Sequence, residues 1–148
     1  MAPVVRKAAC ENSAITWLGR QPSSEVFILM RKAALLVFPS KCYETFGRVA
    51  MEAFAAGTPV IAAGIGAIAE IVEHGRTGLH FEPGNAADLA AKVEWACGHP
   101  EEIKRMGMEA RKEYEAKYMA GQNHQMLMQI YQQAAEHHRM RRKHRGEN

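Results

Sequence analysis

The chain has 148 residues, of which 47% are hydrophobic, and a formal net charge of +3. This length supports one domain with a single core and excludes two domains of ordinary size. Much of the positive charge lies in the last ten residues, RMRRKHRGEN, so the rest of the chain is close to neutral.

Cysteine content and targeting signals indicate the compartment. The three cysteines are odd in number and lack metal-ligand spacing, so we expect packing residues in a reducing compartment. The sequence shows no signal-peptide-like run at its start and no uncharged apolar run of roughly 18 residues. We therefore expect a soluble, cytoplasmic protein. The basic tail is expected to be solvated, with peripheral contact at the inner membrane face as an alternative.

Apolar runs of strand length alternate with segments of helical periodicity along the chain, a pattern typical of parallel β-α-β units. Four runs predict strands: AITWLG (14–19), ALLVFPS (34–40), TPVIAAG (58–64) and TGLHFEPG (77–84). The segments between them predict helices at 21–33, 46–57 and 64–75. We therefore expect an α/β fold, a Rossmann-like parallel sheet with flanking helices, within residues 14–121.

The C-terminal third of the chain is predicted to be helical. Asn85 and Asp88 resemble a capping box at the start of a helix over 86–97. Pro100 followed by two glutamates predicts a further helix. An amphipathic helix is expected over 122–140, with a frayed basic tail over 141–148.

The start of the chain is unusual for this fold class. A doubly wound domain normally opens with a strand, a glycine-bearing turn and a helix, whereas here a short polar segment (1–13) leads directly into AITWLG. We therefore expect a truncated domain. A missing front unit would leave an open strand edge and exposed apolar surface, which favours self-association or a partner chain.

The turn after the second predicted strand is the candidate site, because ligands of open parallel sheets bind beyond the carboxyl ends of the strands. Free N–H groups of residues 46–49 at the helix start favour an anion such as phosphate, and Gly47 permits close approach. Glu44 precedes the helix and Glu52 lies in its second turn. The two carboxylates could accept hydroxyl groups of two polyols flanking a pyrophosphate. Alternatively, Glu44 is a solvated loop residue and Glu52 an ordinary surface position.

The stretch PSKCYETFGRVAMEAFAAGTPVIAAGIGAIAEIVEHGRTGLHFEPGN resembles the C-terminal, donor-binding domain of retaining glycosyltransferases with two Rossmann-like domains, the GT-B architecture of glycosyl transferases group 1. The resemblance implies that Glu44 binds donor-sugar hydroxyls as the catalytic carboxylate, and that Glu52 binds the ribose. The implied backbone ligands of the sugar and pyrophosphate are Thr45, Phe46, Gly47, Arg48 and Val49.

The implied reaction is transfer of a sugar from a UDP- or GDP-sugar to a carbohydrate or lipid acceptor hydroxyl, with retention of configuration. The resemblance implies no metal or other cofactor and no nucleic-acid partner. The chain departs from the pattern in GIGAIAE, where Ala67 follows Gly66, and lacks the upstream unit that supplies cations to the leaving diphosphate. We therefore expect little turnover by this chain alone. The alternative is a non-catalytic nucleotide-sugar-binding or assembly module; an epimerase or phosphorylase fits the motifs less well.

Overall fold

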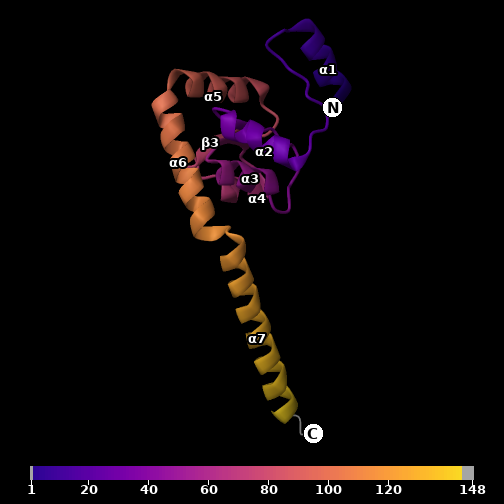
Figure 1. Cartoon of the computed structure of the whole chain (residues 1–148), viewed down its shortest axis with the longest axis vertical. Helices are drawn as coiled ribbons and strands as arrows, with labels where there is room; N and C mark the ends of the chain where they lie inside the picture. The colour runs from indigo at the N-terminus through magenta and orange to yellow at the C-terminus, as the bar shows by residue number, and fades with distance from the viewer. Residues whose placement is uncertain (1, 145–148) are drawn as a thin grey trace.

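The computed structural model describes residues 2–144, which form an α/β body and a long C-terminal helix (Figure 1). The sheet has three parallel strands in the order β1-β2-β3: β1 (Leu36–Phe38), β2 (Val60–Ala63) and β3 (Gly78–Phe81). The helices are α1 (Ala2–Glu11), α2 (Ser23–Lys32), α3 (Arg48–Ala56), α4 (Gly66–Ile71), α5 (Ala86–Gly98), α6 (Pro100–Lys117) and α7 (Ala120–His144). The predicted fold class is confirmed, with three strands in place of four.

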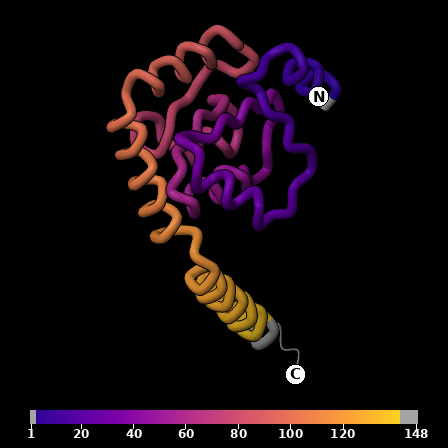
Figure 2. The backbone as a smooth tube through the Cα atoms, turned by 45° about the horizontal axis from the view of Figure 1, so that its top comes forward, coloured from indigo at the N-terminus to yellow at the C-terminus, as the bar shows by residue number. Residues whose placement is uncertain are grey.

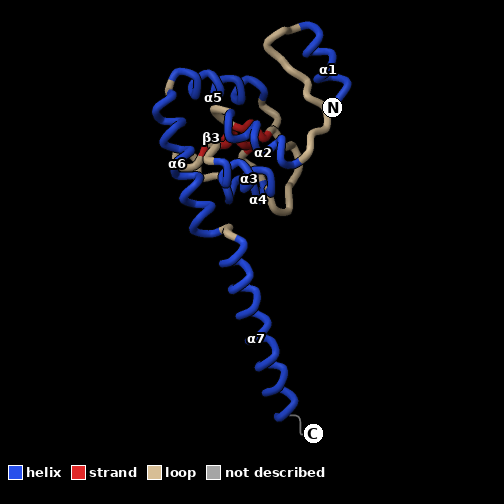
Figure 3. The backbone as a smooth tube through the Cα atoms, viewed as in Figure 1, coloured by secondary structure: helices blue, strands red, loops and turns tan. Residues whose placement is uncertain are grey.

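Both faces of the sheet are covered, which explains why β2 is a continuous apolar run. On one face, Phe54 of α3 packs with Val60 and Ala62. On the other face, Ile61 and Ala63 pack against α5 and α6. Figure 3 shows the short strands enclosed by helices. Because β2 alternates between the two cores, it lies at the centre of the domain.

Local sequence signals explain several helix ends. Gly57 ends α3 in the left-handed conformation with φ 76°. Asn85 caps α5, since its side chain accepts a hydrogen bond from the N–H of Asp88 at 3.0 Å. The capping box is incomplete, because the Asp88 carboxylate accepts from the N–H of Glu82 at 2.7 Å and no hydrogen bond returns to Asn85. The cap therefore fastens the end of β3 to α5 as well.

The two edges of the sheet differ. The N–H of Leu36 donates to Pro59 at 2.9 Å, toward β2, so the N–H and C=O of Val37 point outward. No strand lies beyond β1 among residues 2–144. The outer edge of β3 is closed instead by the 73–77 loop: the N–H of Gly75 donates to Gly78, and the N–H of His80 donates to Nδ1 of His74, both at 2.8 Å.

The first predicted strand is wrong. Residues 14–19 form no strand, and the large apolar side chains in this stretch are 39–49% exposed. A strand needs a neighbour for its backbone groups, and none pairs with this segment in the described part of the chain. Residues 2–11, part of the short polar segment that was assigned no element from the sequence, form α1, which lies at the periphery of the body (Figure 2). Trp17 is 39% exposed and contacts Arg6 at 5.6 Å, so it is not a core residue.

The C-terminal helix is longer than predicted. α7 starts at residue 120 and continues through residue 144, so residues 141–144 are helical; residues 145–148 lie outside the described residues. It extends away from the body (Figure 1), and its apolar side chains Met126, Leu127, Ile130 and Tyr131 are exposed. The prediction that cysteines pack in the interior is also wrong, because Cys10, Cys42 and Cys97 are all exposed.

Candidate donor-binding site

The loop between β1 and α3 ends in an unusually open helix start. No N–H group of residues 45–49 donates a hydrogen bond within the part of the chain that the structure describes, and α3 has no side-chain cap. Ala50 is the first residue whose N–H is engaged, with Gly47 O at 2.9 Å. Consecutive free N–H groups at a helix N-terminus suit an anion.

Gly47 is required by packing as well as by backbone conformation. Its φ is 51°, in the left-handed region. A Cβ at this position would lie 3.0 Å from Cδ1 of Ile68 and 3.1 Å from Cδ1 of Ile71, both on α4. The sequence predicted a glycine that admits a ligand, and the structure adds a reason within the protein, since Gly47 lets α4 pack against the start of α3.

Glu44 lies in the exposed loop before α3. Oγ of Ser40 donates a hydrogen bond to Oε1 of Glu44 at 3.1 Å, which ties the carboxylate to the end of β1. The loop after β2 approaches the same segment, because a Cβ on Gly66 would lie 3.1 Å from the ring of Tyr43 and 3.5 Å from the N of Glu44. Two strand-to-helix loops therefore meet beside Glu44.

Glu52 lies one helical turn beyond Arg48 on α3 and is partly exposed. Nε of Arg48 donates to Oε1 of Glu52 at 2.9 Å. Both residues line a cavity of about 300 Å³, whose other wall comes from α2 and the segment just before it: Gln21, Ser23, Val26, Phe27 and Met30. Glu52 thus faces a pocket between two helices and is more than a surface position.

The remaining predicted site residues lie on the same surface as the open helix start. Thr45, Phe46 and Val49 are exposed, and Phe46 is 60% exposed. Sequence reasoning missed the contribution of α2, whose residues carry no motif. The sequence did predict one helix before β1 and another before β2. Because helices on one face of a parallel sheet pack side by side, this order indicates that α2 contacts α3.

The described residues contain no group of three or more His, Cys, Asp or Glu side chains arranged to hold a metal ion. The ring of His74 covers the outer edge of β3, where its Nδ1 accepts a hydrogen bond from the N–H of His80, and the two histidine rings lie 5.7 Å apart. No helix among the described residues is both long and apolar enough to cross a membrane.

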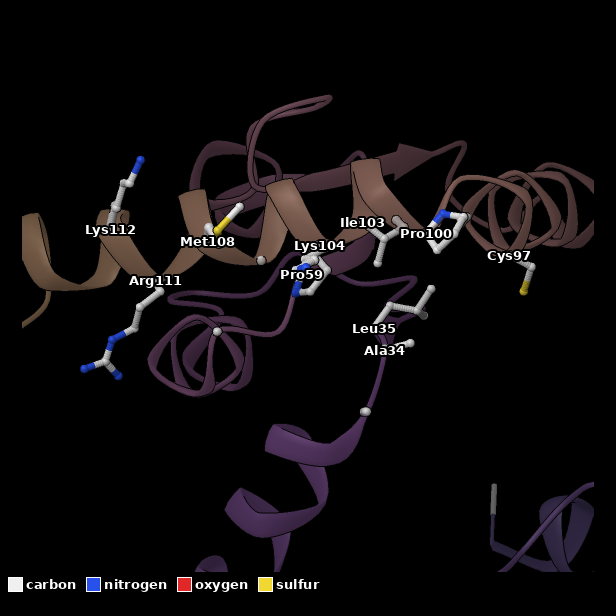
Figure 4. Close-up of a pocket in the computed structure, with 14 residues that line it drawn as sticks. Ala34, Leu35, Pro59, Cys97, Pro100, Ile103, Lys104, Met108, Arg111 and Lys112 are labelled. Carbon is white, nitrogen blue, oxygen red and sulfur yellow. The ribbon is translucent and has the colours of Figure 1, made fainter.

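A larger cavity of about 780 Å³ lies at the opposite end of the strands (Figure 4). Leu35, just before β1, and Pro59, just before β2, line it together with Ile103 and Met108 of α6. Because it adjoins the amino ends of the strands, it is separate from the surface that carries the two glutamates. Its walls are mostly apolar, and its charged lining residues are Lys104, Arg111 and Lys112.

The fold is that of a glycosyltransferase domain, and comparison with known proteins assigns the family. The model of the family "Glycosyl transferases group 1" matches residues 6–113, so the chain belongs to this family of glycosyltransferases. It is 39% identical over 98 residues to glycogen synthase of Mycobacterium tuberculosis, a match over 66% of this chain and 23% of that protein. It is 38% identical over 96 residues to D-inositol 3-phosphate glycosyltransferase of Nocardia farcinica, over 65% of this chain and 21% of that protein.

Solved structures agree with this assignment. Anabaena Alr3699/HepE, in complex with UDP-glucose, matches 71% of this chain with a TM-score of 0.68 and 28% identity. Sucrose-phosphate synthase from Thermosynechococcus elongatus matches 91% of this chain with a TM-score of 0.82 and 28% identity. The chain spans only 29% and 33% of these two structures. It therefore has the C-terminal GT-B glycosyltransferase fold and covers a minority of each relative's length.

Proposed function

We propose that this chain binds the donor of a retaining glycosyl transfer, a UDP- or GDP-sugar, at the loop between β1 and α3. The observation that carries the proposal is the run of free N–H groups over residues 45–49 with Glu44 on one side and Glu52 on the other. The diphosphate lies against the helix start, where backbone N–H groups and the helix dipole offset its charge.

The two carboxylates divide the donor between them. Glu52, on the wall of the cavity between α2 and α3, accepts from the ribose hydroxyls, and the base occupies that cavity. Glu44, held by Ser40, accepts from hydroxyls of the sugar and acts as the catalytic carboxylate. The UDP-glucose complex of Anabaena Alr3699/HepE supports a uridine nucleotide as the first donor to test.

The experiment is a calorimetric titration of the purified chain with UDP, GDP, UDP-glucose and GDP-mannose. We expect one of the nucleotides to bind. The Glu52→Gln variant should lose about 1.5 to 3 kcal/mol of its binding free energy, the contribution of a hydrogen bond to a charged group. Glu94→Gln, on the exposed face of α5, is the matched control and should leave affinity unchanged. The proposed donor site is wrong if none of the four ligands binds. It is also wrong if Glu52→Gln binds the nucleotide as tightly as the control Glu94→Gln does.

We further propose that this chain alone turns over little or none of its donor. The match covers only 29% and 33% of the two solved structures, and the family resemblance implies that acceptor recognition and much of the leaving-group stabilisation come from an upstream unit. Incubation with the bound nucleotide-sugar and a carbohydrate acceptor should release no more nucleotide than a blank without protein. Efficient transfer to an acceptor would contradict this part of the proposal without affecting donor binding.

A further inference from the structure

The ion pair between Arg48 and Glu52 lies where the proposed function needs a hydrogen-bond acceptor for the ribose hydroxyls. Both residues line the cavity between α2 and α3. Their side chains are 78% and 41% exposed, and an exposed pair four residues apart contributes little to stability. Stabilisation of the fold is therefore a poor explanation for the pairing of Arg48 with the Glu52 carboxylate.

Both side chains of the pair can form further hydrogen bonds. The hydrogen bond between them joins Nε of Arg48 to Oε1 of Glu52 at 2.9 Å. No other described residue forms a hydrogen bond or ion pair with either side chain, and a carboxylate and a guanidinium can each form several hydrogen bonds. The pair thus presents an acceptor and a set of donors side by side, since a carboxylate only accepts hydrogen bonds and a guanidinium only donates them.

A vicinal diol matches that arrangement, because each hydroxyl can donate one hydrogen bond and accept another. We infer that the Arg48–Glu52 pair, rather than Glu52 alone, binds the ribose 2′- and 3′-hydroxyls of the nucleotide. Glu52 accepts from the diol while Arg48 positions the carboxylate and donates to the diol oxygens. This inference rests on the proposed function and adds a second ribose ligand to it.

The charge balance of the site supports the same assignment. An unpaired carboxylate one turn from an anion at the start of α3 would repel that anion. Arg48 makes the pair neutral overall, so Glu52 can face the ribose without opposing the diphosphate. In addition, a guanidinium offers donors in a fixed plane, which a lysine does not.

The test compares UDP with 2′-deoxy-UDP by calorimetry for the unmodified chain, Arg48→Gln and Arg48→Lys. We expect the unmodified chain to prefer UDP by about tenfold or more, the factor expected when one hydrogen bond to a charged group is lost. Arg48→Gln should lose most of its affinity for UDP and bind 2′-deoxy-UDP nearly as well as the unmodified chain does. Arg48→Lys, which keeps the charge, should recover part of the preference. If GDP is the nucleotide that binds, GDP and 2′-deoxy-GDP replace these ligands.

Arg111→Gln provides the matched control. Arg111 also pairs with a glutamate four residues on, with Nε of Arg111 and Oε1 of Glu115 at 2.7 Å, but on α6. This variant should keep the preference of the unmodified chain for UDP, and circular dichroism should show all variants folded.

Each outcome separates the two proposals. If the unmodified chain binds neither UDP nor GDP, the proposed function fails. If the chain binds UDP and Arg48→Gln keeps the preference for ribose over deoxyribose, the inference fails while the donor site stands. Equal losses for UDP and 2′-deoxy-UDP would also overturn it, because Arg48 would then serve the diphosphate rather than the diol.

Discussion

Replacing Gly107 on α6 with alanine tests the packing of this helix. Helix propensity predicts that Gly107→Ala raises stability, whereas packing predicts that it lowers stability. A Cβ at this position would lie 2.5 Å from the carbonyl O of Gly57 and 3.3 Å from Cδ of Pro59. The closest atom belongs to the backbone of the turn between α3 and β2, so it cannot rotate away. Gly107→Ala therefore forces α6 off the body by at least about 0.5 Å, the difference between 2.5 Å and the shortest Cβ contacts seen in proteins.

The magnitude follows from two opposing terms. Alanine in place of glycine inside a helix ordinarily stabilises by about 0.5–1 kcal/mol. Overpacking a core costs about 1–3 kcal/mol, and a clash with fixed backbone belongs in the upper half of that range. We expect a net loss of about 1–2 kcal/mol, which lowers the melting temperature by roughly 3–8 °C for a domain of this size.

Thermal unfolding followed by circular dichroism measures this loss. Gly98→Ala is the control, because Gly98 also lies in a helix and a Cβ there would meet nothing within 4 Å. That variant should unfold at the same temperature as the unmodified chain or slightly higher. A Gly107→Ala variant that gains stability as Gly98→Ala does would refute the close approach of α6 to the turn between α3 and β2.

Three further predictions concern a buried hydroxyl, a histidine and a left-handed glycine. Thr58→Val removes the 2.7 Å hydrogen bond to Met30 O and should cost about 1 kcal/mol in urea unfolding; an unchanged midpoint would contradict this. The pKa of His74 is lowered, chiefly by desolvation, so the unfolded chain protonates first and stability falls as pH drops below 6.5. His74→Asn can still accept a hydrogen bond from the N–H of His80, and its stability should differ less between pH values above and below 6.5 than that of the unmodified chain. Gly47→Ala should lower the melting temperature, since a left-handed alanine costs about 1–2 kcal/mol, and a gain would exclude the φ of 51°.

The sequence predicted the central part of the fold because its signals there are local. The apolar runs at 34–40 and 58–64 became β1 and β2, and Gly57 ends α3 as expected. The position of Glu52 in the second turn of α3 followed from the same helix assignment. These features depend on spacing along the chain, which the sequence shows directly.

The features that sequence reasoning missed depend on neighbours distant in the chain. Residues 14–19 have the composition of a strand, yet a strand exists only beside another, and composition does not reveal which partners are available. The pocket at Glu52 requires α2 to pack against α3, a contact that no motif records. The ion pair of Arg48 with Glu52 was readable from its four-residue spacing, but its place on a cavity wall was not.

The unequal sheet edges restrict how copies of this chain could associate. Strand addition requires free N–H and C=O groups, which Val37 presents on the outer edge of β1. The outer edge of β3 is occupied by the 73–77 loop and the His74 ring. Edge-to-edge pairing would therefore consume the open edge of each molecule and stop at two copies. The sheet cannot grow into a fibre by this route while the 73–77 loop stays folded against β3.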